Sequence, residues 1–351
     1  MIKTVQSAKH EPRGKSADSS VESAAPKILE AIKASKSVLL HCHPSPDPDS
    51  VGSALAMKFA LEGMGKKAVV IRGDSEIPEA FMHFPGARDI VPKNFFEVDL
   101  AEFDLFIAQD AASPEMISRR GQFTFPLGIP LVVIDHHASN TKYAPINLVD
   151  TSSPATAFIL YQLFKEWNVT ITRDIAADLF IGMYTDTGGF KYPPTGHEVF
   201  QAAAELSGIF PDFYKLIFTM ENSRSKESIY YEAIALNSIR TYLNENLVIA
   251  AVSNDDLKKK NIPASMASES GVDNLIKSVV GWNIAVQVTE VEPSKVKVSF
   301  RTRDAEKFDL SKLAVALGGG GHKAAAGAVL TMPLEQAIEK IVATAKGIYN
   351  L

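Results

Sequence analysis

The segment 131–137 constrains the fold most strongly, because it is an apolar strand that ends in one carboxylate and two imidazoles. It reads Leu-Val-Val-Ile-Asp-His-His, with no polar residue before Asp135. Two further apolar segments, 37–43 and 103–110, also end in His or Asp. In an open α/β sheet, ligands bind beyond the carboxyl ends of the strands. We therefore expect these polar ends to meet at one edge of a sheet.

A further carboxylate follows the apolar helical stretch 175–183 and precedes two glycines. The resulting set of candidate metal ligands is His43, Asp47, Asp49, Asp110, His136, His137 and Asp186. One catalytic zinc ion needs about three protein ligands, whereas two ions about 3.5–4 Å apart can share bridging carboxylates. The set exceeds what one ion uses, so we expect two divalent ions. The many carboxylates favour Mn²⁺, with Mg²⁺ as the alternative.

The segment 43–49 contains three of these ligands and three prolines. We expect a stiff extended loop, in which Asp47 and Asp49 point the same way because they are two residues apart. The alternative is a turn that leads into an N-capped helix, which explains the aspartates but not His43. Asp110 and Asp186, taken singly, also fit a helix cap or a turn. Only together with the 135–137 segment do they become candidate bridging ligands.

The length of 351 residues predicts two domains, because one hydrophobic core rarely serves so long a chain. Apolar strands alternate with amphipathic helices from 27 to 208, which predicts an α/β domain with a mostly parallel sheet covered on both faces. A smaller α/β domain is expected after it. The predicted organisation is a disordered tail at 1–24, a first domain at 25–220, a helical linker at 221–243 and a second domain at 244–351.

Composition excludes several classes of protein. No apolar run of about 18 residues is available to span a membrane. The N-terminus lacks the apolar core of a signal peptide, and the single cysteine, Cys42, fits a reducing compartment, so we expect a cytoplasmic protein. The net charge of −5 argues against binding of long duplex nucleic acid. Small phosphorylated substrates remain compatible with it.

The second expected domain carries a run of four glycines followed by His322. The backbone N–H groups of this run, which includes Gly320 and Gly321, could cradle a phosphate while His322 donates a further hydrogen bond. A flexible loop is the alternative, but apolar segments on both sides favour an ordered bend. Arg301 and Arg303 are two residues apart on a predicted strand and share one face. Guanidinium groups pair bidentately with phosphate.

These motifs together resemble the DHH phosphoesterase family, which is named for the Asp-His-His found here at 135–137. The resemblance covers roughly residues 27–348 and is to members with a DHH-associated C-terminal domain, the nanoRNase/pAp phosphatase group. It implies that His137 contacts the scissile phosphate, that Asp135 orients the neighbouring imidazole, and that Arg301 and His322 hold the substrate in the cleft between the domains. It also implies that His43 and Asp47 bind one ion, that Asp49 and His136 bind the other, and that Asp110 and Asp186 bridge them.

The resemblance further implies a homodimeric two-metal hydrolase. Its expected substrates are short oligoribonucleotides (nanoRNA) or pApA, cleaved to 5′-mononucleotides, and pAp, cleaved to AMP; cyclic-di-AMP stays open as well. A RecJ-like single-strand exonuclease is the main alternative, although that class usually needs a longer chain. A family II inorganic pyrophosphatase would lack the glycine and histidine run. A non-catalytic sensor of cyclic dinucleotides or nucleotides would be expected to lose metal ligands, and this set is complete.

Overall fold

The computed structural model describes residues 20–351, which form two compact units divided between Asn222 and Ser223. Residues 1–19 of the expected tail lie outside the described residues. Helix α1 (Val21–Ala34) already begins within the range expected to be disordered. It begins there because the side chain of Ser20 accepts a hydrogen bond of 3.3 Å from the backbone N–H of Ser23.

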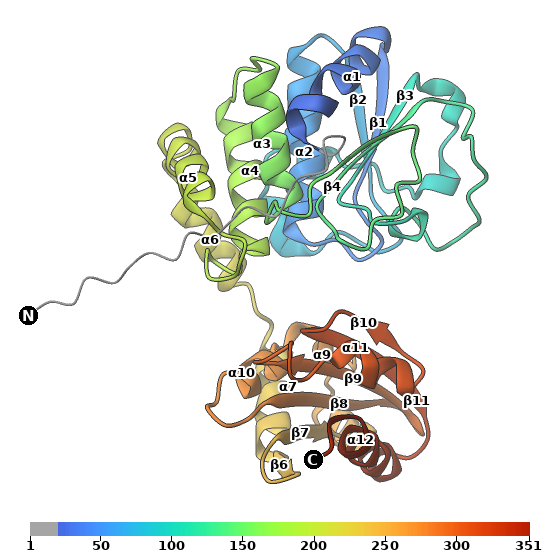
Figure 1. Ribbon diagram of the computed structural model, residues 1–351, viewed down its shortest axis with the longest axis vertical. Coiled ribbons are helices and arrows are strands. Elements are labelled where there is room, and N and C mark those ends of the chain that lie inside the picture. The colour runs from blue at the N-terminus through green and yellow to red at the C-terminus, as the bar shows by residue number, and fades with distance from the viewer. Residues whose placement is uncertain (1–19) are drawn as a thin grey trace, which may run out of the picture. The chain divides into compact units, whose positions relative to one another are not determined.

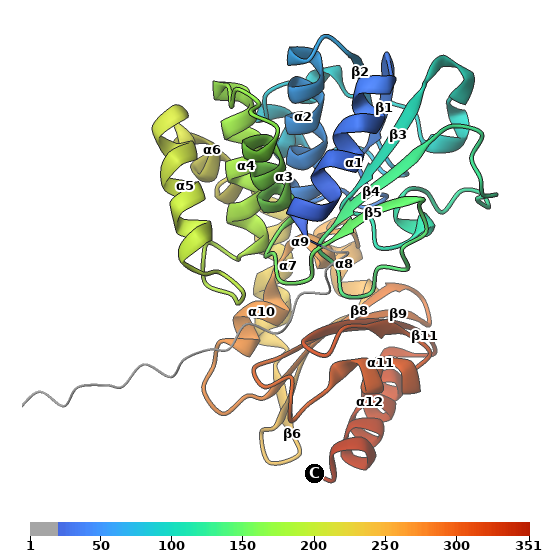
Figure 2. The same cartoon turned by 45° about the horizontal axis from the view of Figure 1, so that its top comes forward.

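The N-terminal unit is built on a five-stranded parallel sheet with the order β2-β1-β3-β4-β5, so the predicted α/β fold with a parallel sheet is confirmed. Figure 2 shows these strands lying side by side. Because the strands are parallel, the residues that follow the neighbouring strands β1, β3 and β4 reach the same edge. The strands are β1 (Ser37–His41), β2 (Lys67–Ile71), β3 (Leu105–Gln109), β4 (Leu131–Asp135) and β5 (Ile146–Val149).

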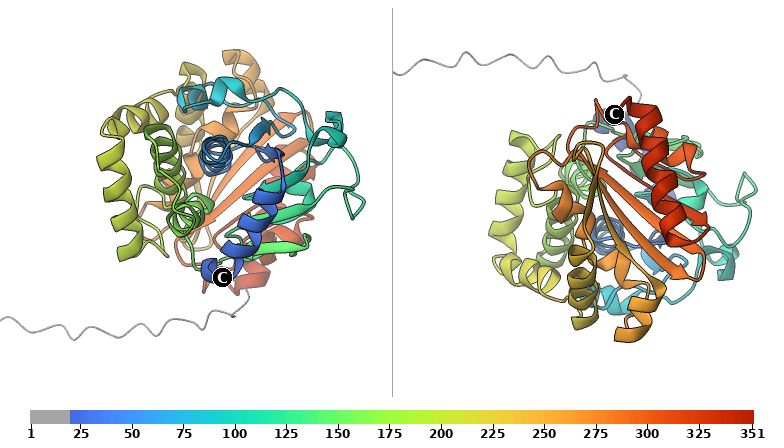
Figure 3. Two further views of the ribbon diagram at one scale, coloured as in Figure 1. Left: turned by 90° about the horizontal axis from the view of Figure 1, so that it is seen from above. Right: turned by 90° about the horizontal axis from the view of Figure 1, so that it is seen from below.

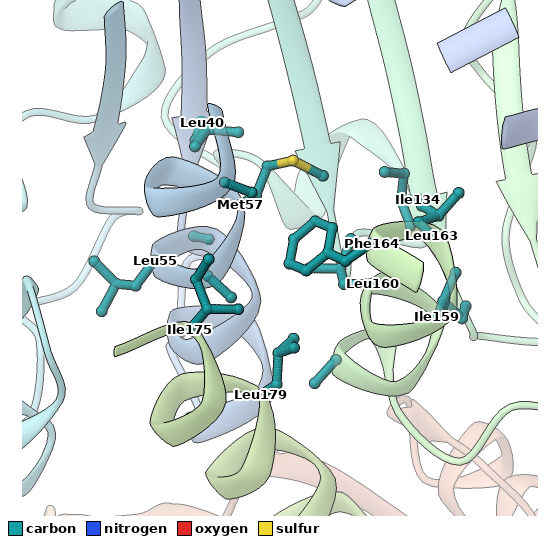
Figure 4. Packing of buried hydrophobic residues seen from close by; sticks show 14 of the residues in the cluster. Leu40, Leu55, Met57, Ile134, Ile159, Leu160, Leu163, Phe164, Ile175 and Leu179 are labelled. Carbon is teal, nitrogen blue, oxygen red and sulfur yellow. The ribbon is translucent and has the colours of Figure 1, made fainter. Parts of the chain in front are cut away.

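Long helices cover one face of this sheet, and Figure 4 shows part of the apolar core that they enclose. Helix α2 is buried along almost its whole length between the sheet and α4. A Cβ at Gly52 would lie 2.5 Å from the carbonyl oxygen of Asp178, so glycine is what permits this close packing. The helices are α1, α2 (Pro48–Gly63), α3 (Thr156–Glu166), α4 (Arg173–Asp186), α5 (His197–Ile209) and α6 (Phe213–Glu221), seen in Figure 1.

The other face of the sheet differs from the prediction, because no long helix covers it in the described part of the chain. Its core forms where Leu39, Phe106 and Val133 of the sheet pack with residues such as Phe95 and Phe103. These come from short 3-10 helices and loops, which contain too few residues to show a helical period. The short helices are η1 (Glu79–His83), η2 (Ala87–Asp89), η3 (Phe95–Glu97), η4 (Leu100–Glu102) and η5 (Pro114–Met116).

The C-terminal unit contains a six-stranded mixed sheet with the order β10-β11-β9-β8-β7-β6. Only β7 and β8 pair in parallel among its described strands. Helix α12 lies across one face, as the right panel of Figure 3 shows. The strands are β6 (Arg240–Tyr242), β7 (Leu247–Val252), β8 (Ile284–Glu292), β9 (Lys295–Thr302), β10 (Gly320–Gly321) and β11 (Ala325–Thr331). The helices are α7 (Lys226–Asn237), α8 (Asn254–Lys260), α9 (Met266–Glu269), α10 (Val272–Lys277), α11 (Leu310–Ala316) and α12 (Leu334–Tyr349).

The segment expected to be a helical linker, 221–243, contains α7 and β6. Helix α7 is part of the C-terminal unit, because its residues Tyr231 and Ala235 are fully buried in a core with Val248 and Ala250. Across residues 20–351, no helix has the length and apolar character needed to cross a membrane.

Candidate functional site

All seven candidate metal ligands lie at the carboxyl edge of the N-terminal sheet. The neighbouring strands β1, β3 and β4 bring in His43, Asp110, His136 and His137, and Asp186 is the last residue of α4. The ligand atoms fall into three groups, in each of which they lie within 4.8 Å of one another. The groups are His43, Asp47 and Asp110; Asp110, His136 and His137; and Asp49, His136 and Asp186.

Asp110 occupies the centre of this cluster. Its Oδ2 lies 3.8 Å from Nε2 of His43, while its Oδ1 lies 3.6 Å from Nε2 of His136 and 3.6 Å from Nδ1 of His137. The backbone of Asp110 is left-handed, with φ of 53°, which turns the chain sharply after β3. The hydroxyl of Thr156 donates a hydrogen bond of 3.1 Å to Oδ1. A carboxylate placed in this way can serve two ions.

The segment 43–49 departs from the extended loop that its prolines predict. Pro48 is instead the first residue of α2, where a missing N–H costs least. Asp47 is the N-cap, and its Oδ1 accepts a hydrogen bond of 2.9 Å from the N–H of Ser50, while its Oδ2 lies 3.1 Å from Nε2 of His43. Asp49 is already in the first turn of the helix. The two aspartates therefore belong to different ligand groups, and they do not lie on an extended segment as predicted.

Asp49 lies in the first turn of α2 and caps another helix, α3. The N-cap residue of α3 is Ala155, whose side chain cannot accept a hydrogen bond. The carboxylate of Asp49 supplies the missing acceptor, taking hydrogen bonds of 2.7 Å from the N–H of Thr156 and 2.9 Å from that of Ala157. A Cβ at Gly182 would lie 2.7 Å from Oδ1 of Asp49, so α4 needs a glycine at this point. Three helices thus fix one carboxylate.

Asp135 holds His137. Its Oδ1 accepts a hydrogen bond of 2.8 Å from Nδ1 of His137, and its Oδ2 accepts one of 2.7 Å from the side-chain amide of Asn140. The carboxylate is fully buried, whereas the His137 side chain remains 30% exposed. This arrangement fixes the ring of His137 and leaves its other nitrogen available to a substrate.

The cluster concentrates negative charge away from water. Burial, and then the carboxylate of Asp186, raises the pKa of Asp49 to about 7. Burial and the carboxylates of Asp49 and Asp47 raise the pKa of Asp110 well above its usual range. For His136, burial acts to lower the pKa, but its contact with Asp186 at 3.3 Å and the charges of Asp110 and Asp49 together raise it to about 10. The site therefore attracts protons or other cations.

The donor set fits divalent metal ions. Among residues 20–351, Nε2 of His136 is buried and forms no hydrogen bond, although it lies 3.6 Å from one carboxylate and 3.3 Å from another. Clustered carboxylate oxygens and imidazole nitrogens are ligands that Mn²⁺ and Mg²⁺ accept. These groups could hold metal ions, and bound cations would neutralise the charge that burial makes unfavourable.

In the C-terminal unit, Arg301 lines a pocket of about 230 Å³ on the side of the sheet covered by α9 and α10. Its Nη1 donates to the carbonyl of Phe300 and to Oγ of Ser299, and lies 3.5 Å from Oδ2 of Asp273. Arg303 instead donates to the carbonyl groups of Lys277 and Ser278 at the end of α10. Of the two arginines, Arg301 is therefore the one that lines this pocket.

The glycine run forms part of a β-hairpin. Gly320 and Gly321 are β10, which pairs with β11. A Cβ at Gly319 would lie 2.1 Å from the carbonyl oxygen of Gly327, so the glycine there permits the close approach of the two segments. The N–H groups of Gly318, Gly319 and His322 donate to backbone carbonyl groups within this unit, so these three N–H groups are already used. The side chain of His322 is exposed.

Several residues of the site could not be recognised from sequence alone. Thr156, Asn140 and Gly182 carry no ligand chemistry of their own, and each acts on Asp110, Asp135 or Asp49. Asn140 has the clearest sequence signal, because it follows the Asp-His-His segment within a short polar stretch.

Comparison with known protein families agrees with this site. Residues 37–183 match the N-terminal domain of the DHH family, and residues 244–350 match the DHHA1 domain. The chain therefore belongs to the DHH phosphoesterase family, whose members are hydrolases that act on phosphoester bonds. The predicted family resemblance is confirmed.

Two of the relatives that match most of the chain carry the same name. A protein of Thermus thermophilus named bifunctional oligoribonuclease and PAP phosphatase NrnA is 29% identical over 330 residues, which is 90% of this chain and 91% of the relative. The protein of the same name from Bacillus subtilis is 26% identical over 313 residues, covering 86% and 91% of the two chains. An exopolyphosphatase-related protein from Bacteroides fragilis shares the fold, with a TM-score of 0.82 at 20% identity over 94% of this chain and 98% of the other.

Proposed function

We propose that this protein hydrolyses short oligoribonucleotides, pApA and pAp with two divalent metal ions, most suitably Mn²⁺. The observation that carries the proposal is the position of Asp110, whose two carboxylate oxygens face His43 on one side and His136 and His137 on the other. The names of the relatives support oligoribonucleotides and pAp as substrates. We further propose a homodimer in the cytoplasm, on the basis of the sequence and the family resemblance.

The geometry of the cluster supports a division of the proposed ligands between two ions. His43 and Asp47 would hold one ion, Asp49 and His136 the other, and Asp110 would bridge them. Asp186 lies within 4.8 Å of the second pair, and the family resemblance makes it a second bridging ligand. When bound, divalent cations lower the pKa of water to produce a nucleophile and stabilise the charge that develops on the phosphate.

The remaining residues would bind and orient the substrate. His137 would donate a hydrogen bond to the scissile phosphate from the ring nitrogen that does not contact Asp135. Asp135 would keep that ring fixed. Burial acts to raise the pKa of Asp135, but the hydrogen bonds from His137 and Asn140 outweigh burial and hold this pKa below its usual value, so the carboxylate stays ionised. In the C-terminal unit, Arg301, His322, Gly320 and Gly321 would hold the part of the nucleotide that does not react.

A parallel turnover assay tests the substrate class. Purified protein with Mn²⁺ is given pAp, pApA, RNA of two to five nucleotides, cyclic-di-AMP and pyrophosphate. We expect release of mononucleotides from the short RNA and pApA, and release of phosphate from pAp. Turnover of pyrophosphate alone would contradict the proposal, as would binding of cyclic-di-AMP without turnover of any of the five.

A further inference from the structure

A row of aromatic side chains on the N-terminal unit leads from its surface toward the metal cluster. We call Phe96, Phe123, Phe125 and Tyr143 the aromatic ladder. The ring of Phe123 lies 4.9 Å from that of Phe96 and stacks on that of Phe125 at 6.1 Å with an angle of 13°. The ring of Phe125 lies 6.0 Å from that of Tyr143. The side chain of Phe96 is 41% exposed and that of Phe125 is 40% exposed, so the ladder is open to solvent at these two rings.

The inner end of the aromatic ladder is fixed beside Asp110. The hydroxyl of Tyr143 donates a hydrogen bond of 3.1 Å to the carbonyl of Ala111, the residue after Asp110. The side chain of Asn140 donates to the same carbonyl at 3.3 Å and also to Asp135 at 2.7 Å. The ladder is therefore continuous with the residues that orient the site.

The loop between β3 and β4 carries Arg119 and Arg120, which precede Phe123 and Phe125 by a few residues in the sequence, and it is hydrogen-bonded to the segment beside His43. Asp74 accepts hydrogen bonds of 2.7 Å from Oγ of Ser118 and 2.7 Å from the N–H of Arg119, and its carbonyl accepts one of 2.6 Å from Arg120. The preceding residue, Gly73, packs so closely on His43 that a Cβ would lie 2.4 Å from the His43 carbonyl oxygen. The loop is therefore linked to the residues around His43 as well as to Asp110, which it follows in the sequence.

Positive charge near the aromatic ladder is available for an anion. Within residues 20–351, no ion pair is formed by Arg119 or by Lys142, which precedes Tyr143; the nearby carboxylate of Asp74 pairs with Arg120 instead. The guanidinium of Arg119 donates a hydrogen bond of 3.8 Å to the sulfur of Met116, which leaves its charge uncompensated. Exposed aromatic rings interleaved with unpaired cations are the arrangement that binds single-stranded nucleic acid, because bases stack on the rings while phosphates pair with the cations.

We propose that the aromatic ladder, with Arg119, binds the bases and phosphates of an oligoribonucleotide beyond the nucleotide being cleaved. This inference rests on the proposed function and specifies how the protein would distinguish substrates by their length. A substrate such as pAp, with one base, has no second base to stack. An oligoribonucleotide of five residues has several.

The test compares two substrates within each variant. We measure kcat/KM for pentaadenylate and for pAp with wild type, Phe125→Ala, Phe125→Leu and Arg119→Gln. The matched control is Phe200→Ala, because Phe200 is an exposed aromatic residue of α5 (53% exposed) outside the aromatic ladder. We expect the ratio of kcat/KM for pentaadenylate to kcat/KM for pAp to fall roughly 5- to 150-fold when stacking is lost. Phe125→Leu keeps apolar bulk for folding and should show the same fall, whereas Phe200→Ala should keep the wild-type ratio.

An unchanged ratio in the Phe125 variants overturns the inference, and so does a dimer that becomes a monomer in Phe125→Ala, since the surface would then join two copies of this chain. If wild type hydrolyses neither substrate, the proposed function fails, and the surface is tested by binding of fluorescein-labelled pentaadenylate without Mn²⁺. Binding weakened by Phe125→Ala but not by Phe200→Ala supports the surface. Equal affinities overturn it.

Discussion

Oδ2 of Asp49 accepts a hydrogen bond of 2.7 Å from the backbone N–H of Thr156, 107 positions further along the chain. This contact places a proposed metal ligand at the N-terminus of α3, where the helix dipole favours a negative charge. One carboxylate therefore contributes to both the packing of the helices and the candidate metal site, and changes around it should affect stability and activity together.

Gly182→Ala should disturb Asp49 directly. The added Cβ would lie 2.7 Å from Oδ1 of Asp49 and 2.8 Å from the Cβ of Ala157. We expect the free energy of unfolding to fall by about 1–3 kcal/mol, as for other overpacked sites, and turnover to fall as well. The matched control is Gly208→Ala in α5, where an added Cβ would meet no neighbouring atom within 4 Å. Alanine there should raise stability by up to about 1 kcal/mol. Chemical denaturation of both variants checks this, and equal effects would refute the role of Gly182.

The metal-free protein should lose stability as the pH rises. The pKa of Asp49 is raised to about 7 in the folded protein, from about 3.9 when unfolded. Its stabilising contribution is complete below the unfolded pKa and is lost as the pH rises through the folded pKa. His136 has a folded pKa of about 10 against about 6.5 unfolded, so its contribution has the same sign over a higher range.

Thermal unfolding in EDTA measures this dependence. We expect Tm to fall between about pH 5 and pH 9, and to fall less steeply with Mn²⁺ bound, because the cation replaces the protons. Asp49→Asn should flatten the lower part of the profile. A Tm that rises over this range in EDTA, with the same slope in wild type and Asp49→Asn, would show that the cluster does not carry the charge described.

His136 and His137 should differ when each is replaced by alanine. His136 is the proposed ligand of one ion together with Asp49, so His136→Ala should reduce the occupancy of that ion. His137 is held by Asp135 and is more exposed, so His137→Ala should lower kcat with metal largely retained. Metal analysis of the two purified variants, together with kcat, separates the effects. Equal metal loss in both would contradict the proposed role of His137.

Arg301→Ala and His322→Ala should each cut kcat/KM for pAp by about 10- to 200-fold, if each loses one charge-assisted hydrogen bond to substrate. Metal content should be unchanged. A control in the same unit is Arg240→Ala, because Arg240 pairs with Glu335 on the surface. Bis-p-nitrophenyl phosphate, which carries no nucleotide, should be hydrolysed by every variant at nearly the wild-type rate. Equal losses on both esters would mean that Arg301 and His322 do not act on the nucleotide.

The parallel sheet and the candidate ligands could be predicted from sequence, because each apolar strand ends in residues with ligand chemistry and parallel strands share one edge. The extended loop predicted at 43–49 was wrong and its alternative, a turn that leads into an N-capped helix, was right, since three prolines indicate an extended loop unless one of them occupies the first position of a helix. The capping of α3 by Asp49 could not be predicted, because it depends on how two helices distant in sequence are packed. The same applies to α7, which is a linker by composition but buries Tyr231.

Asp110 is proposed to bridge two metal ions, and a metal titration coupled to turnover tests this role most directly. Wild type should bind two Mn²⁺ per chain and hydrolyse pAp. Asp110→Asn should abolish turnover and lower the stoichiometry, because an amide lacks the charge that serves both ions, and Asp186→Asn should do the same if Asp186 also bridges. A single Mn²⁺ per chain in active wild type, or an Asp110→Asn variant with normal metal content and near-wild-type kcat, would contradict the account.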